Sequence, residues 1–192
     1  MIDPIVTKVK GFLLKPVETF QQSRNDEPGV VFTYFAALLL FNAILSALFG
    51  AAEFGSMQMF SGMMGGFTYP VRIFFMALVG GFILTITLAS WIHLWAYLFG
   101  GRKGIMQTFK AIMYGNTPHL LLGWIPFIGI FFALWSLVLG ILGIRELQEV
   151  STGKAILIIA IAVIIPLILI ILFAVFFNPS NMYFYPVHGY AD

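Results

Sequence analysis

The sequence contains no cysteine and has very little charge. Of its 192 residues, 60% are apolar and only 9% are charged. The absence of cysteine excludes disulfides, thiolate metal sites and cysteine nucleophiles. A soluble domain carries about 25% charged residues, so this chain cannot cover its surface with side chains that suit water. The composition therefore predicts an integral membrane protein.

Known catalytic motifs are lacking as well. The sequence has no His-Glu-x-x-His, Gly-x-Ser-x-Gly, Walker-type or dinucleotide-binding glycine pattern. The formal net charge of +2 is too small and too scattered to indicate a nucleic-acid partner. We expect a protein that is not an enzyme, binds no cofactor and has the lipid bilayer as its main partner.

Long apolar runs are the main positive signal, because a helix needs about 20 such residues to cross the hydrocarbon core. The expected spans are residues 30–50, 71–99, 105–122, 125–144 and 155–177. The third and fourth come from one stretch that can also be read as a single span with a soluble approach. We predict an all-α integral membrane protein, a single five-transmembrane-helix bundle.

The positions of the basic residues predict the orientation. With five spans, one side holds Lys8, Lys10, Lys15, Arg24, Arg102, Lys103, Lys110, Arg145 and Lys154, and the other holds only Arg72. Since cytoplasmic loops are rich in Lys and Arg, we expect a cytoplasmic N-terminus and an external tail at residues 178–192.

Residues 1–29 predict a cytoplasmic amphipathic segment. Asp3-Pro4 can start a helix, and Ile5, Val9 and Phe12 follow at helical spacing with lysines between them. One interpretation is an interfacial helix in the inner headgroup layer. The alternative is an exposed helix packed on the cytoplasmic loops of the bundle.

Small and polar residues at helical spacing mark expected packing faces, because membrane helices associate through close approach and interhelical hydrogen bonds. The two stripes are Asn42, Ser46 and Gly50 in the first span, and Ala133, Ser136, Gly140 and Gly143 in the fourth. We expect the neighbouring Leu139 to face lipid.

Other polar residues at membrane depth are Ser90, His93, Lys110, Asn116 and His119. Such residues are either structural or part of a pathway for ions or solutes. We expect Lys110 to anchor its helix by extending its ammonium towards the cytoplasm. Asn116, Pro118 and His119 predict a break in the third span, whose freed backbone groups need protein or water partners.

A methionine-rich segment lies between the first two spans. Met57, Met59, Met63 and Met64 are candidate Cu(I) ligands, because thioethers are soft donors. The alternative is that these flexible side chains pack in a short helix at the outer headgroups.

The arrangement of spans resembles the Yip (Ypt-interacting protein) family in its short prokaryotic form. The matching positions are Pro16 in Leu14–Phe20, Tyr114 and Pro118 in Ala111–Leu121, Pro126 and Gly129 in the turn after Trp124, and Trp135. The resemblance implies a membrane protein that associates with other membrane proteins or with itself. Eukaryotic members also associate with prenylated Rab GTPases.

This chain has Leu14-Lys15-Pro16-Val17 where those proteins have an acidic motif, and it lacks their long N-terminal region. Both differences argue against small-GTPase binding and indicate a bacterial or archaeal cell membrane. We therefore expect a scaffold or a module for protein or lipid interaction. The alternative is a small-solute or ion conduit that uses the polar faces of the second and third spans.

Overall fold

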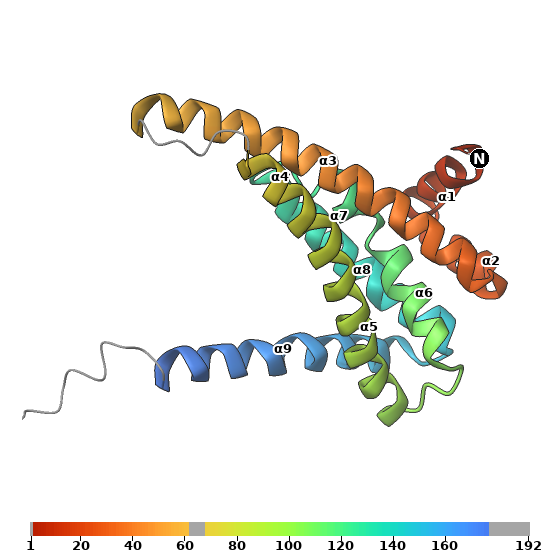
Figure 1. Cartoon of the computed structure of the whole chain (residues 1–192). Helices are drawn as coiled ribbons and strands as arrows, with labels where there is room; N and C mark the ends of the chain where they lie inside the picture. The colour runs from red at the N-terminus through yellow and green to blue at the C-terminus, as the bar shows by residue number, and fades with distance from the viewer. Residues whose placement is uncertain (1, 62–67, 177–192) are drawn as a thin grey trace, which may run out of the picture.

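The computed structural model describes residues 2–61 and 68–176, and every regular element within them is helical (Figure 1). The elements are α1 (Ile2–Leu14), α2 (Pro16–Gln22), the short 3-10 turn η1 (Ser23–Asn25), α3 (Pro28–Ser61), α4 (Thr68–Phe75), the π-helical segment η2 (Met76–Gly80), α5 (Gly81–Leu98), α6 (Ile105–Gly115), α7 (Thr117–Leu122), α8 (Ile128–Gln148) and α9 (Thr152–Phe176).

Four segments of the described chain are long and apolar enough to cross a membrane: Pro28–Gly50, Tyr69–Leu98, Ile128–Gln148 and Thr152–Phe176. They correspond to the segments expected at 30–50, 71–99, 125–144 and 155–177, with bounds that differ by up to four residues. The segment Ile128–Gln148 begins and ends later than the expected 125–144. Its charged last turn, which holds Arg145 and Glu146, is part of the helix.

The remaining expected span, 105–122, consists of two short helices. Helix α6 ends at Gly115 and α7 starts at Thr117, with Asn116 between them at φ −75° and ψ −2°. The segment expected as the third span is therefore interrupted at Asn116, close to Pro118 and His119, which also favoured a break. Both short helices pack along α8.

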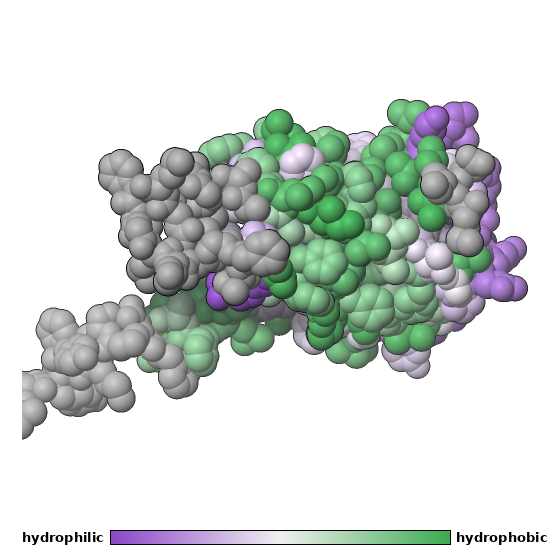
Figure 2. Space-filling view, turned by 45° about the horizontal axis from the view of Figure 1, so that its top comes forward, coloured by the Kyte–Doolittle hydropathy of each residue, from purple (hydrophilic) through white to green (hydrophobic). Residues whose placement is uncertain are grey.

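The core lies where α3, α5, α6, α8 and α9 meet. Helix α6 is its centre, since the side chains from Lys110 to Tyr114 are all buried. Most large apolar side chains elsewhere face outward, including Leu84 and Ile170, each 65% exposed. In Figure 2 this apolar surface covers the middle of the molecule, whereas hydrophilic residues gather at the end where α1 and α2 lie. Such a surface suits lipid and not water.

Helices α1 and α2 fold back onto the bundle. Phe12 is fully buried, and its ring stacks on Tyr114 with centroids 4.7 Å apart. Phe20 meets Phe12 edge to face. This packing holds α1 on helices α3 and α6 of the bundle, whereas the second interpretation placed it on the loops. Exposed Val6 and Leu14 lie on its outer side. Location in the headgroup layer remains a prediction.

Candidate functional site

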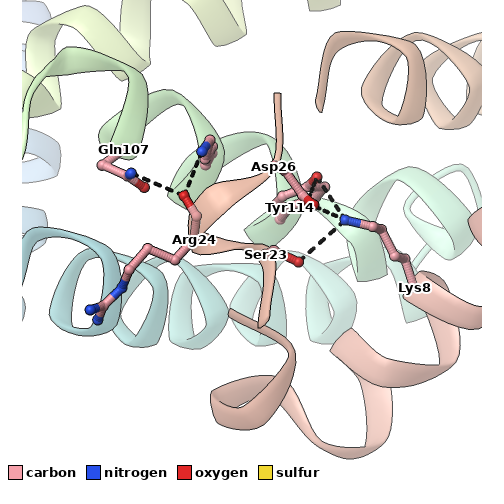
Figure 3. A network of polar contacts seen from close by, with 7 residues as sticks. Lys8, Ser23, Arg24, Asp26, Gln107 and Tyr114 are labelled. Carbon is pink, nitrogen blue, oxygen red and sulfur yellow. Dashed lines mark hydrogen bonds and ion pairs between the residues drawn. The ribbon is translucent and has the colours of Figure 1, made fainter. Parts of the chain in front are cut away.

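A polar network at the hydrophilic end joins α1 and η1 to α6 (Figure 3). Lys8 on α1 forms an ion pair with Asp26 and donates a hydrogen bond to Ser23 Oγ at 3.3 Å. It also donates to the Tyr114 hydroxyl at 3.1 Å, which in turn donates to Asp26 Oδ2 at 2.5 Å. The carboxylate of Asp26 is therefore held from both sides, by an ammonium and by a phenol.

The protonation of Asp26 follows from these contacts. Burial raises the pKa of its carboxyl, but the hydrogen bonds from Lys8 and Tyr114 and the charge of Lys8 lower it by more. The pKa of Asp26 consequently lies below its ordinary value of 3.8. Asp26 is thus a carboxylate at neutral pH, and its charge contributes to the attachment of α1.

Arg24 connects the same turn to α6 and to the end of α8. Its backbone carbonyl accepts hydrogen bonds from Lys110 Nζ at 2.6 Å and from Gln107 Nε2 at 3.1 Å. Its guanidinium donates to Glu149 at 2.6 Å and to the Glu146 carbonyl at 2.8 Å. The backbone carbonyl and the side chain of Arg24 are therefore both hydrogen-bonded to the bundle.

The expected position of Lys110 is wrong in one respect. Lys110 is only 4% exposed, so its ammonium does not extend into water. The turn at η1 covers it, and the carbonyl of Arg24 takes the place of solvent. The ammonium of Lys110 is hydrogen-bonded to the protein instead of being hydrated, and its role as an anchor stays a prediction.

Gln148, at the end of α8, organises the loop between α5 and α6. Its amide nitrogen donates to the Gly104 carbonyl and to Thr108 Oγ1, each at 2.9 Å, and its oxygen accepts from the Lys103 backbone at 3.2 Å. Thr108 also contacts His93 Nδ1 at 2.9 Å. His93 is therefore part of a structural chain of hydrogen bonds that runs from α5 to α8.

Glu149, directly after α8, pairs with two basic side chains. Lys103 and Arg24 both form ion pairs with its carboxylate. The hydrogen bond from Lys103 lowers the pKa of this carboxyl, and the charge of Arg24 acts in the same direction. Because Glu149 is solvent-exposed, these pairs add little stability.

The backbone groups freed at the break between α6 and α7 find partners on two other helices. The His119 amide donates to Ser136 Oγ on α8 at 3.0 Å. Asn42 on α3 donates to the Leu120 carbonyl at 3.1 Å. Thr117 Oγ1 donates to the Tyr114 carbonyl at 2.6 Å and also contacts the Tyr34 hydroxyl. Asn42 and Ser136 therefore support a broken helix inside the bundle.

The predicted small-residue stripes lie as follows. Gly140 contacts Gly115 on α6, and Gly143 contacts Ala111 and Phe20. Ser136 is buried, whereas Ala133 is exposed. In α3, Gly50 lies against Ile73, and Ser46 lies 3.5 Å from the Asn42 side chain.

Leu139 does not face lipid as expected. It is fully buried, because α8 contacts α6 and α7 as well as α2 and α9. More than one face of α8 is therefore covered by neighbouring helices. The stripe of small residues predicted only one buried face.

The other predicted residues are spread over the molecule. Ser90 is exposed and donates to the Ile86 carbonyl of its own helix. Pro16 and Pro118 lie in the first turns of α2 and α7. Pro126 lies in the turn before α8, Gly129 is the second residue of α8, and Trp135 is 40% exposed on that helix.

The methionine prediction falls largely outside the described part of the chain. Met63 and Met64 lie outside the described residues, as does the tail at 178–192. Met57 and Met59 belong to the last turns of α3, whose side chains are not described there. Among the described residues, no three His, Asp or Glu side chains gather where they could share a metal ion.

Sequence reasoning missed several residues of the polar network. Asp26, Ser23, Thr108 and Gln148 were not singled out, because each belongs to a short polar stretch next to a span. Their positions next to the ends of the spans could have indicated them, since a polar side chain at a helix end near the membrane needs a hydrogen-bond partner.

No curated protein and no solved structure matches this chain. The family model of the Yip1 domain matches residues 10–175, from the second half of α1 to the last turn of α9. The match covers the helical bundle together with Asp26 and Tyr114 of the network, whereas Lys8 lies before its first residue.

Proposed function

The chain belongs to the Yip1 domain family, and we propose that it is a non-enzymatic membrane scaffold with five spans and a cytoplasmic interaction face. One observation carries this proposal. The charged and polar residues of α1, η1 and α6 hold a folded arm, α1–α2, against the bundle. The arm presents the exposed side chains of Lys10, Lys15 and Glu18 as a fixed surface.

The contacts of α8 support a fifth span at residues 105–122. Gln148, at one end of α8, contacts Gly104 just before α6. At the other end, Gly129 lies so close to Gly123 that a Cβ on Gly129 would be 2.5 Å from the Gly123 carbonyl oxygen. Helices α6 and α7 therefore cover the same depth as α8. At 1.5 Å per residue they extend roughly 26 Å, close to the thickness of about 30 Å of a hydrocarbon core.

The distribution of basic residues supports the orientation. Lys8, Arg24, Lys103 and Lys110 are joined in contacts at one end of the bundle. Arg72 begins the second span at the far end of the same bundle. The basic end is the cytoplasmic one if the chain follows the usual preference of cytoplasmic loops for Lys and Arg.

Cysteine substitutions test this topology, and the lack of native cysteine makes the labelling specific. Arg102→Cys, Phe127→Cys and Thr152→Cys each replace an exposed residue. In whole cells, an impermeant thiol reagent should label Phe127→Cys alone, and the other two only after permeabilisation. Protection of Phe127→Cys in intact cells would mean that residues 105–122 do not cross.

A conduit is the second candidate function, and His93 and Lys110 would be its polar residues. In the described structure both are engaged in hydrogen bonds with Thr108 and Arg24. These contacts favour the scaffold, since a residue that conducts must exchange partners easily.

Two measurements separate the candidates. Vesicles containing the protein should show the same proton and potassium flux as empty vesicles, and Lys110→Met should not alter it. A photoreactive residue at Lys10 should crosslink in cells to a second protein or a second copy, whereas the same residue at lipid-facing Leu169 should not. Flux that Lys110→Met abolishes would favour the conduit.

A further inference from the structure

A cavity of about 210 Å³ lies between α5, α8 and α9, with the break between α6 and α7 as its floor. Leu88, Ile92, Leu137 and Val163 give it apolar walls. Its polar lining includes Asn116 and His119. None of the contacts described above uses these two side chains.

These two side chains are in an unusual position for membrane depth. Nδ1 of His119 is buried beside Gly123, which does not line the cavity, and it has no hydrogen-bond partner in the described part of the chain. The Asn116 amide likewise has none among the described residues. An unpaired polar group away from water costs free energy, and the hydrocarbon core offers no water to satisfy it. A molecule that enters the cavity can supply a hydrogen bond to the Asn116 amide.

The cavity communicates with the lipid. Leu137 and Val163 on its rim are 42% and 47% exposed, and Ala133 beside them is exposed too. Beyond the crossing of α5 and α9, α9 diverges from α4 (Figure 1). A molecule dissolved in the bilayer can therefore reach Asn116 from the side.

Buried water is less suited to this cavity than an amphiphile. The cavity is large enough to hold several water molecules. Each buried water needs two to four polar partners, and most of the wall is hydrocarbon. A molecule with one polar group and an apolar body matches both parts of the lining.

We propose that this cavity binds an uncharged lipid-soluble molecule that carries a carbonyl or hydroxyl group, with that group against Asn116 and His119. The absence of charge follows from the lining, which contains no Lys, Arg, Asp or Glu. An amide and an imidazole can each donate a hydrogen bond to a carbonyl oxygen. This proposal is independent of the scaffold function.

The molecule also provides an internal comparison. A groove of about 300 Å³ between α3 and the second span is lined by Ala36, Leu39, Leu78, Val79, Phe82 and Ile83, with no polar side chain. A lipid chain can lie there without any requirement for a hydrogen-bonding group. Binding at the two places should therefore differ in chemistry.

Photolabelling of the full chain in phospholipid vesicles tests the proposal. One probe is a long-chain ketone with its carbonyl near the middle, and the other is the matching alkane, each with a diazirine beside the chain centre. Labelled positions are mapped by mass spectrometry, and labelling of the cavity is divided by labelling of the Ala36 groove. The ketone should give a ratio roughly two- to tenfold higher than the alkane, the range expected for one hydrogen bond.

Two pairs of variants identify the site. Asn116→Leu should reduce the ketone ratio to that of the alkane, whereas Thr87→Val, at an exposed position of α5, should not. Ala133→Phe should reduce labelling of the cavity by both probes, whereas Ala36→Phe should reduce labelling of the groove only. If Asn116→Leu fails to fold, Ala133→Phe still decides, because its side chain starts from an exposed position.

Equal ratios for ketone and alkane would overturn the proposal, since the polar lining would then make no contribution. Labelling that stays unchanged in Ala133→Phe would also overturn it, because the probe would lie elsewhere. If neither probe labels the cavity, water alone occupies it, and the proposal is overturned as well.

Discussion

Gly115 and Gly140 meet backbone to backbone where α6 crosses α8, but the contact is not symmetrical. A Cβ on Gly115 would lie 3.0 Å from the Gly140 amide nitrogen and 3.2 Å from its Cα. A Cβ on Gly140 would meet only Ile112 Cδ1, at 3.9 Å. Close approach therefore requires glycine at Gly115, while Gly140 has room for a methyl group.

This asymmetry predicts the outcome of two otherwise similar substitutions. Gly115→Ala should destabilise the protein by about 1–3 kcal/mol, because backbone atoms cannot yield to the added methyl. Gly140→Ala should be neutral or slightly stabilising. Thermal aggregation in mild detergent gives the comparison, and equal loss in both variants would contradict the predicted geometry.

Asp26→Asn should weaken the attachment of α1. The substitution removes the ion pair with Lys8 and the charge that accepts the Tyr114 hydrogen bond. Hydrogen bonds to charged groups contribute about 1.5–3 kcal/mol, and we expect a loss of about 2 kcal/mol. Hydrogen exchange of α1 amides should become faster.

Glu27→Gln is the matched control for that experiment, because Glu27 is the exposed acidic neighbour of Asp26. Its α1 amides should exchange at the rate of the parent protein. If both variants exchange equally fast, local charge and not the contacts of Asp26 holds the arm.

The attachment of α1 should also depend on pH. The folded-state pKa of Asp26 is lowered from 3.8, so the stabilisation is complete above the unfolded pKa and is lost as the pH falls through the folded pKa. Electron paramagnetic resonance distances between labels at Lys10→Cys and Thr152→Cys should broaden only below about pH 4.

Asp26→Asn should show the broadened distances already at neutral pH and respond little to acid. A pH response that is unchanged in this variant would assign the titration to another group, with Glu149 as the first to examine.

Gln148→Met should destabilise the end of α8 strongly. Gln148 is 2% exposed and makes hydrogen bonds with Gly104, Thr108 and Lys103. Each hydrogen bond contributes about 1 kcal/mol, and leaving partners unsatisfied adds to the cost, so we expect a loss of at least about 2 kcal/mol. Gln22→Met, at an exposed position, should change little in the same unfolding assay.

The sequence was sufficient to predict the class of the fold and the family. An uninterrupted apolar run marks each of the four long segments, and hydrophobicity over about 20 residues is a local property. The resemblance to the Yip family is confirmed by the match to residues 10–175. The break near Asn116 was predictable too, since polar residues and Pro118 interrupt the apolar pattern there.

The polar network could not be predicted in the same way. Lys8 is 18 residues from Asp26, and Asp26 is 88 residues from Tyr114. Nothing in the local pattern pairs them, because their contact depends on α1 turning back onto α6. For the same reason a helical stripe identified Ser136 and Gly143 as buried but missed Leu139, since periodicity indicates one face and not how many neighbours a helix has.

The π-helical segment Met76–Gly80 divides the second span into two halves with different neighbours. Helix α4 and η2 contact α3, whereas α5 contacts α6 and α9 through a buried stripe of Thr85, Ala89, Ile92 and Ala96. An α-helix turns by about 100° per residue, so removing one residue between Met76 and Gly80 would rotate that stripe by about a quarter of a circle relative to α4. The chain would keep a segment long enough to cross the bilayer, yet only one half of it could retain its partners. The number of residues in this span is therefore fixed by rotational phase and not by membrane thickness.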